Sequence, residues 1–226
     1  MVKKFPANTQ LLVLLGQIKV AQNKIDDAAQ AYKEAIARQP NDPLGYRALT
    51  ELYTNQKNWK DAESTLQAAL KQMPSDMNLR LSYAGLQILK GDQETAIGQY
   101  EAILKDQPNS PVAINNLVSL LTDYRSDKAS LDRAFSLSEA FKNSNVPQFQ
   151  DTYGWALYRR GDFAEAISVL EGVAAKQPNL AAVHYHLGKS YTAAGQPEKA
   201  AEQLKLALAL EPDGTALKES IRAAMK

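Results

Sequence analysis

Six prolines recur along the chain at a spacing that constrains its fold more than any other sequence feature. They are Pro6, Pro40, Pro74, Pro108, Pro178 and Pro212. Four of the five intervals between them are 34 residues, and the fifth, of 70 residues, is the sum of 34 and 36. A period of 34 residues is typical of tandem units of two antiparallel helices, each too small to bury its apolar face alone.

The residues between these prolines show a second regularity, in which small and large side chains occupy fixed positions. If the recurrent proline is position 32 of each unit, position 20 is alanine in all six units, once the fourth is given a four-residue insertion. Position 8 is small in five units, with Val118 the exception, and position 24 is bulky in five. Small side chains facing large ones predict two helices that cross closely. The alanines are Ala28, Ala62, Ala96, Ala134, Ala166 and Ala200.

Capping residues predict helix boundaries in the same register. Asp42 and Ser110 each precede a proline, the pattern of an N-cap followed by the first helical residue. Glycines ahead of Asp92 and Asp162 are expected to end first helices in the left-handed conformation, and these aspartates to cap the second helices.

In this register the chain resembles the tetratricopeptide repeat (TPR) family. Residues 187–191, Leu-Gly-Lys-Ser-Tyr, followed by Ala200, Leu204, Ala207 and Pro212, nearly reproduce the family consensus. The resemblance covers almost the whole chain and implies an all-α fold, a right-handed superhelical α-solenoid of about six helix-turn-helix units with a C-terminal capping helix. The expected segments are the tail of a preceding repeat helix (1–8), repeats at 9–42, 43–76, 77–110, 111–146 (irregular), 147–180 and 181–214, and a capping helix (215–226).

The fourth repeat is irregular. Residues 122–132 separate its helices by four extra residues, and two residues are lost before Pro147. One interpretation is a protruding helix end or loop around residues 124–130, which contacts a partner or changes the pitch of the superhelix. The alternative is a surface insertion that the fold tolerates.

Composition argues against several classes of partner and chemistry. The 226 residues include 26 basic and 25 acidic side chains, a formal net charge of +1, so no whole-molecule field favours a nucleic acid or an anionic membrane. The chain has no cysteine, which excludes disulfides, cysteine-ligated zinc and thiol nucleophiles. No apolar run approaches the roughly 20 residues that cross a bilayer, so we expect no direct membrane insertion.

The two histidines offer neither a catalytic nor a metal site. His184 and His186 are two positions apart, about 200° around a helix, so they cannot ligate one metal ion together. His184 falls at a core position and is expected to pack there. The sequence contains no phosphate-binding loop, nucleophile elbow or Ser-His-Asp arrangement. We therefore expect no enzyme activity, catalytic residue, metal or cofactor.

First helices of such an array line its concave surface, where recognition takes place. Positions 2, 5, 9, 12 and 13 lie opposite the packing face and are expected to point into that surface. In the fifth and sixth repeats they carry aromatic and charged residues of the types that dominate binding hot spots. The candidate partner-binding residues are Arg47, Glu51, Asn78, Asn115, Ser119, Asp151, Trp155, Tyr158, Arg159, Tyr185 and Lys189.

Other interpretations of these positions stay open. Trp155 and Tyr158 could instead fill space beside the irregular fourth repeat. Some family members clamp the C-terminal carboxylate of a peptide, but the resemblance does not extend to that clamp. Glu51 occupies one of the clamp positions and would repel a carboxylate.

The leading functional prediction is a non-catalytic protein–protein interaction scaffold that binds a peptide or partner protein. Residues 113–117, 151–158 and 184–188 resemble the C-terminal repeats of long bacterial lipoproteins that accompany exosortase and exopolysaccharide export systems. That resemblance implies a piece of a longer periplasmic protein, with the cytoplasm as the alternative location. A second prediction is carbohydrate binding, in which Trp155, Tyr158 and Tyr185 stack on the sugar rings of a polysaccharide.

A third prediction is self-association through an apolar first helix. Residues 11–18 are almost entirely apolar, and Met1–Pro6 matches the tail of a second helix, as if the array were cut within a repeat. We expect any dimer formed through this surface to be lost when an upstream repeat is added.

Overall fold

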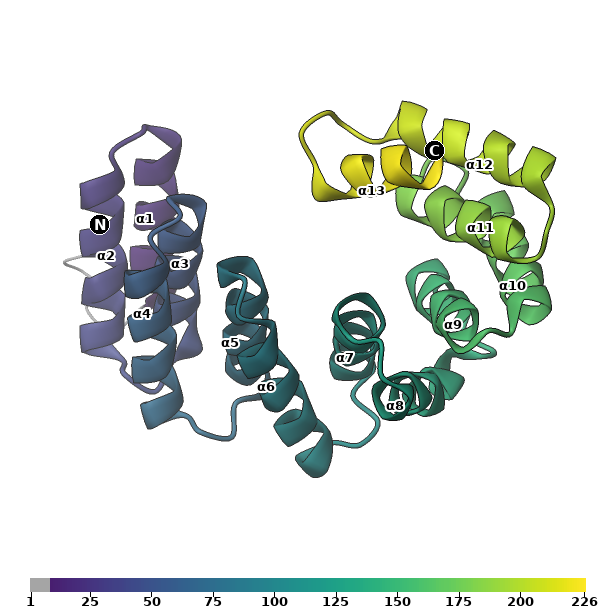
Figure 1. Ribbon diagram of the computed structural model, residues 1–226. Coiled ribbons are helices and arrows are strands. Elements are labelled where there is room, and N and C mark those ends of the chain that lie inside the picture. Colours follow the sequence, from purple (N-terminus) through teal and green to yellow (C-terminus); the bar gives the residue numbers. More distant parts are fainter. Residues whose placement is uncertain (1–8) are drawn as a thin grey trace. The chain divides into compact units, whose positions relative to one another are not determined.

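The computed structural model describes residues 9–226, which contain α-helices and one short 3-10 helix but no strand (Figure 1). The predicted all-α repeat fold is confirmed. The predicted tail of a preceding helix (1–8) lies outside the described residues. The chain divides into two compact units, an N-terminal unit that ends at Pro108 and a C-terminal unit, Asn109–Lys226.

The N-terminal unit consists of three antiparallel hairpins. α1 contacts α3 and α3 contacts α5, so the first helices of the hairpins form a row. The surface of this row that is turned away from the second helices is the inner face of the unit. Its helices are α1 (Thr9–Ala21), α2 (Ile25–Arg38), α3 (Pro43–Asn55), α4 (Trp59–Gln72), α5 (Met77–Lys90) and α6 (Gln93–Asp106).

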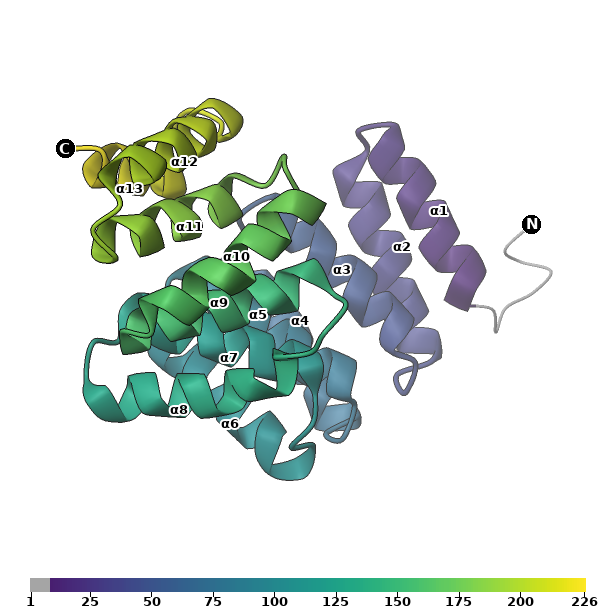
Figure 2. The same ribbon diagram turned by 90° about the vertical axis from the view of Figure 1, so that its right-hand side faces the viewer.

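The C-terminal unit is built in the same way. α9 contacts both α7 and α11, and these three first helices line its inner face. α13 lies against α11 and α12 at the end of the chain (Figure 2). The helices are α7 (Pro111–Tyr124), α8 (Lys128–Ser138), the 3-10 helix η2 (Glu139–Phe141), α9 (Pro147–Arg160), α10 (Phe163–Lys176), α11 (Ala181–Ala193), α12 (Pro197–Leu210) and α13 (Ala216–Ala224).

The predicted packing of small against large side chains is confirmed. All six alanines at position 20 are buried, none more than 4% exposed. At position 8, a Cβ on Gly154 would come within 2.7 Å of Leu170 Cγ, and one on Gly188 within 2.8 Å of Leu204 Cγ. A larger residue at either glycine would displace a core leucine, because helices in a packed interior leave no spare volume.

The fourth repeat reverses the sizes at these two positions. Val118, the bulky exception at position 8, and Ser138, the small exception at position 24, are both fully buried. α7 and α8 pack against each other. Each exception therefore lies in the core, at a position where the other repeats carry a side chain of the opposite size.

The four predicted N-caps lie where expected, and two of them bond to their helix. Asp42 accepts a hydrogen bond from the Leu44 amide, and Asp92 accepts one from the Thr95 amide. Ser110 and Asp162 also stand at the predicted N-cap positions, of α7 and α10, but their side chains make no capping hydrogen bond. The Asp162 carboxylate instead accepts from the Arg160 guanidinium.

The insertion in the fourth repeat takes the form of added helix. Residues 125–127 connect α7 to α8, and Ala134 is the seventh residue of α8, whereas the equivalent Ala166 is the fourth residue of α10. After Ala134 the α-helix stops early, at Ser138, and continues as η2. Tyr124, at the end of α7, is 57% exposed. Whether this helix end contacts a partner stays a prediction.

Leu14 and Ile18 of α1 are half exposed, at 51% and 46%. The residues equivalent to Ile18 in α3 and α5 are Leu52 and Leu86, 5% and 3% exposed. The difference arises because no described second helix precedes α1. Self-association through this surface stays a prediction. Despite the apolar character of α1, no helix among residues 9–226 combines the length and hydropathy needed to cross a bilayer.

Glu63 on α4 joins two repeats of the N-terminal unit. Its Oε2 lies 2.6 Å from Lys90 Nζ, and its Oε1 accepts from Gln87 Nε2 at 3.0 Å and from the Tyr83 hydroxyl at 3.3 Å. The hydrogen bond from Lys90 is the largest influence that lowers the pKa of Glu63 below its ordinary value near 4.5. Glu63 therefore stabilises the fold above that ordinary value, and the stabilisation is lost as the pH falls through the lowered pKa.

We expect Glu63→Gln to flatten the acid side of the stability profile. Between about pH 5 and pH 3 the wild-type free energy of unfolding should fall more steeply than that of the variant, because only the wild type must protonate a paired carboxylate. Urea denaturation at a series of pH values measures both slopes. Glu34→Gln, which removes a surface carboxylate paired with Arg38, is the control and should keep the wild-type slope. Equal slopes for wild type and Glu63→Gln would contradict the prediction.

Candidate functional site

The eleven candidate residues divide between the two units. Arg47, Glu51 and Asn78 are exposed on α3 and α5 of the N-terminal unit. The other eight lie on α7, α9 and α11 of the C-terminal unit, and the rings of Trp155, Tyr158 and Tyr185 come into contact there. The structure therefore brings together the aromatic part of the predicted set.

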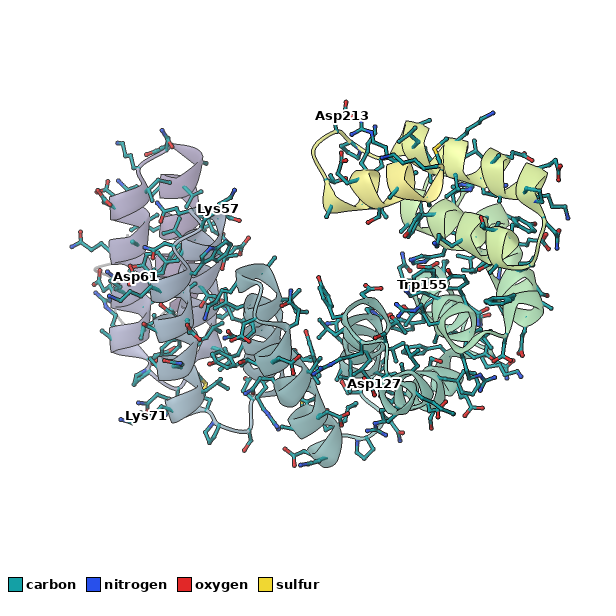
Figure 3. All side chains as sticks on the ribbon, viewed as in Figure 1. Lys57, Asp61, Lys71, Asp127, Trp155 and Asp213 are labelled. Atoms are coloured by element: carbon teal, nitrogen blue, oxygen red, sulfur yellow. The ribbon has the colours of Figure 1, made fainter. Side chains whose placement is uncertain are left out.

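Trp155 is the centre of this group, and it is buried. Figure 3 labels it on α9, and only 8% of its surface is exposed. Its Nε1 donates a hydrogen bond to Asp123 Oδ1 of α7 at 2.9 Å. The Tyr158 ring stacks on the indole, with centroids 4.6 Å apart and planes 13° from parallel. Trp155 thus links α9 to α7 and contributes to the packing of the unit.

His186 completes the cluster, although the sequence analysis did not include it in the site. Its imidazole stacks on the Trp155 indole with centroids 4.2 Å apart, and its Nδ1 lies 2.9 Å from Asp151 Oδ1. The side chains of Asp151 and His186 are each only 16% exposed. One sequence signal could have identified this pair. An acidic residue, Asp151, is at position 5 of the fifth repeat, and a histidine, His186, is at position 6 of the sixth. Trp155, Tyr158, Tyr185 and His186 are the aromatic cluster.

Several predicted polar residues are engaged within the fold. Asn115 on α7 accepts a hydrogen bond from the Thr152 hydroxyl of α9 at 2.8 Å. Arg159 Nη2 donates to the main-chain carbonyl of Arg125, between α7 and α8, at 2.9 Å. These bonds tie neighbouring repeats together and fix the aromatic cluster in place.

Three side chains around the cluster keep free hydrogen-bonding groups. The hydroxyls of Tyr158 and Tyr185 and the ammonium of Lys189 make no hydrogen bond or ion pair with another described residue, and all three residues are partly exposed. Burial is the main cause that raises the pKa of the Tyr185 hydroxyl, and charges on Tyr158 and Asp123 add to the increase, while Arg159 opposes it. The Tyr185 hydroxyl therefore lies within electrostatic reach of both acidic and basic groups.

His184 packs in the core, as predicted. It is 5% exposed, its Nδ1 lies 2.7 Å from Gln203 Oε1, and its Nε2 lies 2.9 Å from the carbonyl oxygen of Pro178. Both ring nitrogens are thus occupied. Residues 9–226 contain no group of three or more histidine and carboxylate side chains arranged to hold a metal ion.

Stacked two-helix hairpins with a row of first helices define an α-helical repeat protein, a class that recognises its partners over an extended surface. Family models described as tetratricopeptide repeat match residues 13–62, 53–121 and 157–224, more than half of the chain. The chain belongs to the tetratricopeptide repeat family.

Individual relatives agree with this assignment. TPR repeat-containing protein PA4667 of Pseudomonas aeruginosa is 28% identical over 187 residues, which are 81% of this chain but 31% of that protein. The chain therefore spans about a third of the length of this relative. The structure of Pseudomonas aeruginosa PilF superposes with a TM-score of 0.70 at 16% identity, covering 95% of this chain and 96% of PilF. YrrB, described as a TPR protein with an unusual peptide-binding site, superposes with a TM-score of 0.51 at 18% identity, covering 98% and 95%.

Proposed function

We propose that this chain is a non-catalytic protein–protein interaction scaffold and that the inner face of its C-terminal unit binds a peptide or a partner protein. The observation that supports the proposal most directly is the set of free groups on Tyr158, Tyr185 and Lys189 around the buried Trp155. Tyrosine and tryptophan provide large contact areas and lose little conformational entropy on binding, which is why they dominate hot spots.

The rigidity of the cluster favours binding. Trp155 is held by two stacked rings and one hydrogen bond, so Tyr158 is already ordered before a partner arrives. Association then loses less side-chain freedom than it would on a mobile surface. YrrB, a protein of this fold, has an unusual peptide-binding site, which supports a peptide as one class of ligand.

We expect Tyr185→Ala to weaken partner binding strongly while leaving the unit folded. Tyr185 is partly exposed and contacts Trp155 at a tilted angle, with centroids 6.1 Å apart, so its loss should lower the free energy of unfolding by about 1–2 kcal/mol, less than the loss of a fully buried aromatic residue. Loss of a hot-spot side chain should weaken binding by at least about thirtyfold. A partner recovered with the full-length parent protein would be purified, and its dissociation constant measured by calorimetry.

Tyr185→Phe is the matched control. It keeps the ring and removes only the free hydroxyl, so it should bind more tightly than Tyr185→Ala. If Tyr185→Ala binds the partner with wild-type affinity, the aromatic cluster is not the binding site.

We also propose a cellular compartment and a pathway for the parent protein. We place the parent protein in the periplasm, within an exopolysaccharide secretion system, on the basis of the three sequence phrases at 113–117, 151–158 and 184–188. Fractionation of cells that express the tagged parent tests the compartment, and recovery in the cytoplasm would overturn it.

Carbohydrate binding is the weaker alternative. Stacking on a sugar requires an open aromatic face, but two rings already stack on the Trp155 indole, which is 8% exposed. No observation in the C-terminal unit favours a sugar over a peptide.

A further inference from the structure

The N-terminal unit has a pocket of its own, on the inner face between α1 and α3. Its volume is about 160 Å³. Pockets that hold drug-sized ligands measure roughly 300–1,000 Å³, so this one has room for a single side chain. The residues that decide its chemistry are Gln17, Val20, Tyr32, Glu51, Leu52 and Asn55.

The polar groups of the pocket have no partners within the described chain. Gln17, Glu51 and Asn55 make no side-chain hydrogen bond or ion pair with another described residue. Arg47, one turn before Glu51 on α3, neither pairs with it nor lines the pocket. Among the described residues Glu51 is therefore the one charged group on the pocket wall, and its carboxylate is free to bind a cation.

The remaining wall is apolar. Val20 and Leu52 supply aliphatic surface, and the ring of Tyr32, 3% exposed, contributes the floor. The negative charge of Glu51 reaches that floor, because it raises the pKa of Tyr32 further after burial has raised it. Apolar pocket walls beside an exposed carboxylate suit a side chain with an aliphatic stem and a cationic head.

We propose that this pocket binds a lysine or arginine side chain of an extended partner segment, its stem along Val20 and Leu52 and its cationic head at Glu51. The amide oxygens of Gln17 and Asn55 supply further acceptors for the N–H groups of that head. The inference rests on the proposed scaffold function but concerns a different unit from the aromatic cluster. An acidic segment is excluded, because Glu51 would repel its carboxylates.

The test uses the full chain, labelled with ¹⁵N, and three blocked pentapeptides that differ only in a central lysine, norleucine or glutamate. We expect the lysine peptide to shift the amide signals of Gln17, Val20, Glu51 and Asn55 in a saturable manner. Norleucine has a similar stem without the charge and should bind at least fivefold more weakly, and the glutamate peptide should not bind.

Variants locate the interaction. Glu51→Gln should weaken lysine-peptide binding by about fivefold, the range of a partly exposed charge pair, and Glu51→Lys should abolish it. Glu34→Gln, which removes a surface carboxylate outside the pocket, should bind as the wild type does. Both positions, 51 and 34, are on the surface, and far-UV circular dichroism checks that each of the three variants folds.

Equal binding of the lysine and norleucine peptides, or wild-type affinity in Glu51→Gln, would overturn the proposal. Its failure is distinguishable from failure of the scaffold function. A partner that binds normally to Glu51→Gln but is lost from Tyr185→Ala refutes the pocket and keeps the scaffold. Saturable lysine-peptide binding that Tyr185→Ala leaves unchanged supports the pocket independently of the aromatic cluster.

Discussion

Trp155→Ala is expected to lower the free energy of unfolding of the C-terminal unit by about 3–5 kcal/mol, the range for truncating a buried tryptophan. The indole is 8% exposed, carries two stacked rings and donates a hydrogen bond to Asp123. Its removal leaves a cavity between α9 and α11 and frees His186 and Tyr158 from their common stacking partner. Loss of binding in this variant would therefore report unfolding as well as recognition.

The measurement is urea denaturation followed by far-UV circular dichroism and by fluorescence. The chain has two tryptophans, and in Trp155→Ala the remaining one, Trp59, reports on the N-terminal unit alone. Trp155→Phe is the control: it keeps an aromatic ring but loses the Nε1 donor, so it should cost only about 1–2 kcal/mol. A Trp155→Ala variant as stable as the wild type would contradict the burial described for this residue.

Gly16→Ala should destabilise the N-terminal unit by about 1–3 kcal/mol, although alanine is the better helix former. Gly16 lies within α1, where a Cβ would come within 2.1 Å of Tyr32 Cε1. Tyr32 is 3% exposed and packs with Leu49 and Leu52, so a shift of its ring disturbs that cluster. The overpacking should therefore exceed the gain in helix propensity.

Gly98→Ala provides the matched control within the same unit. Gly98 lies inside α6, and a Cβ there would meet nothing within 4 Å. This variant should be more stable than wild type by about 0.5–1 kcal/mol, because only helix propensity changes. Thermal and urea denaturation followed by far-UV circular dichroism measure both effects. The same sign for both variants would show that the contact between Gly16 and Tyr32 does not limit side-chain size at position 16.

Much of the fold could be predicted from the sequence because the same pattern of packing residues recurs in each repeat. The alanines at position 20 identify one crossing point in six independent copies, and all six are buried. The exceptions were harder to interpret. Val118 and Ser138 depart from the pattern of the other repeats, and only the structure shows that both are nevertheless fully buried.

The candidate site was less predictable, since helical periodicity gives the direction of a side chain but not what lies above it. Trp155 satisfies the periodicity of an inner-face residue, yet side chains from two neighbouring helices cover it. The sequence did not place Asp123 and His186 in the site, because each acts through a contact with Trp155 across a repeat boundary. Trp155 is 32 residues from Asp123 and 31 residues from His186.

By itself the sequence determined the repeat length, the helix pairs and the alanine crossing points, because these depend on interactions within a hairpin and on a pattern repeated along the chain. Only the tertiary structure decided which inner-face side chains are covered and which stay open, because that depends on how each first helix packs against its neighbours. It buried Trp155, left Tyr185 partly exposed, and left Glu51 unpaired on the wall of a small pocket.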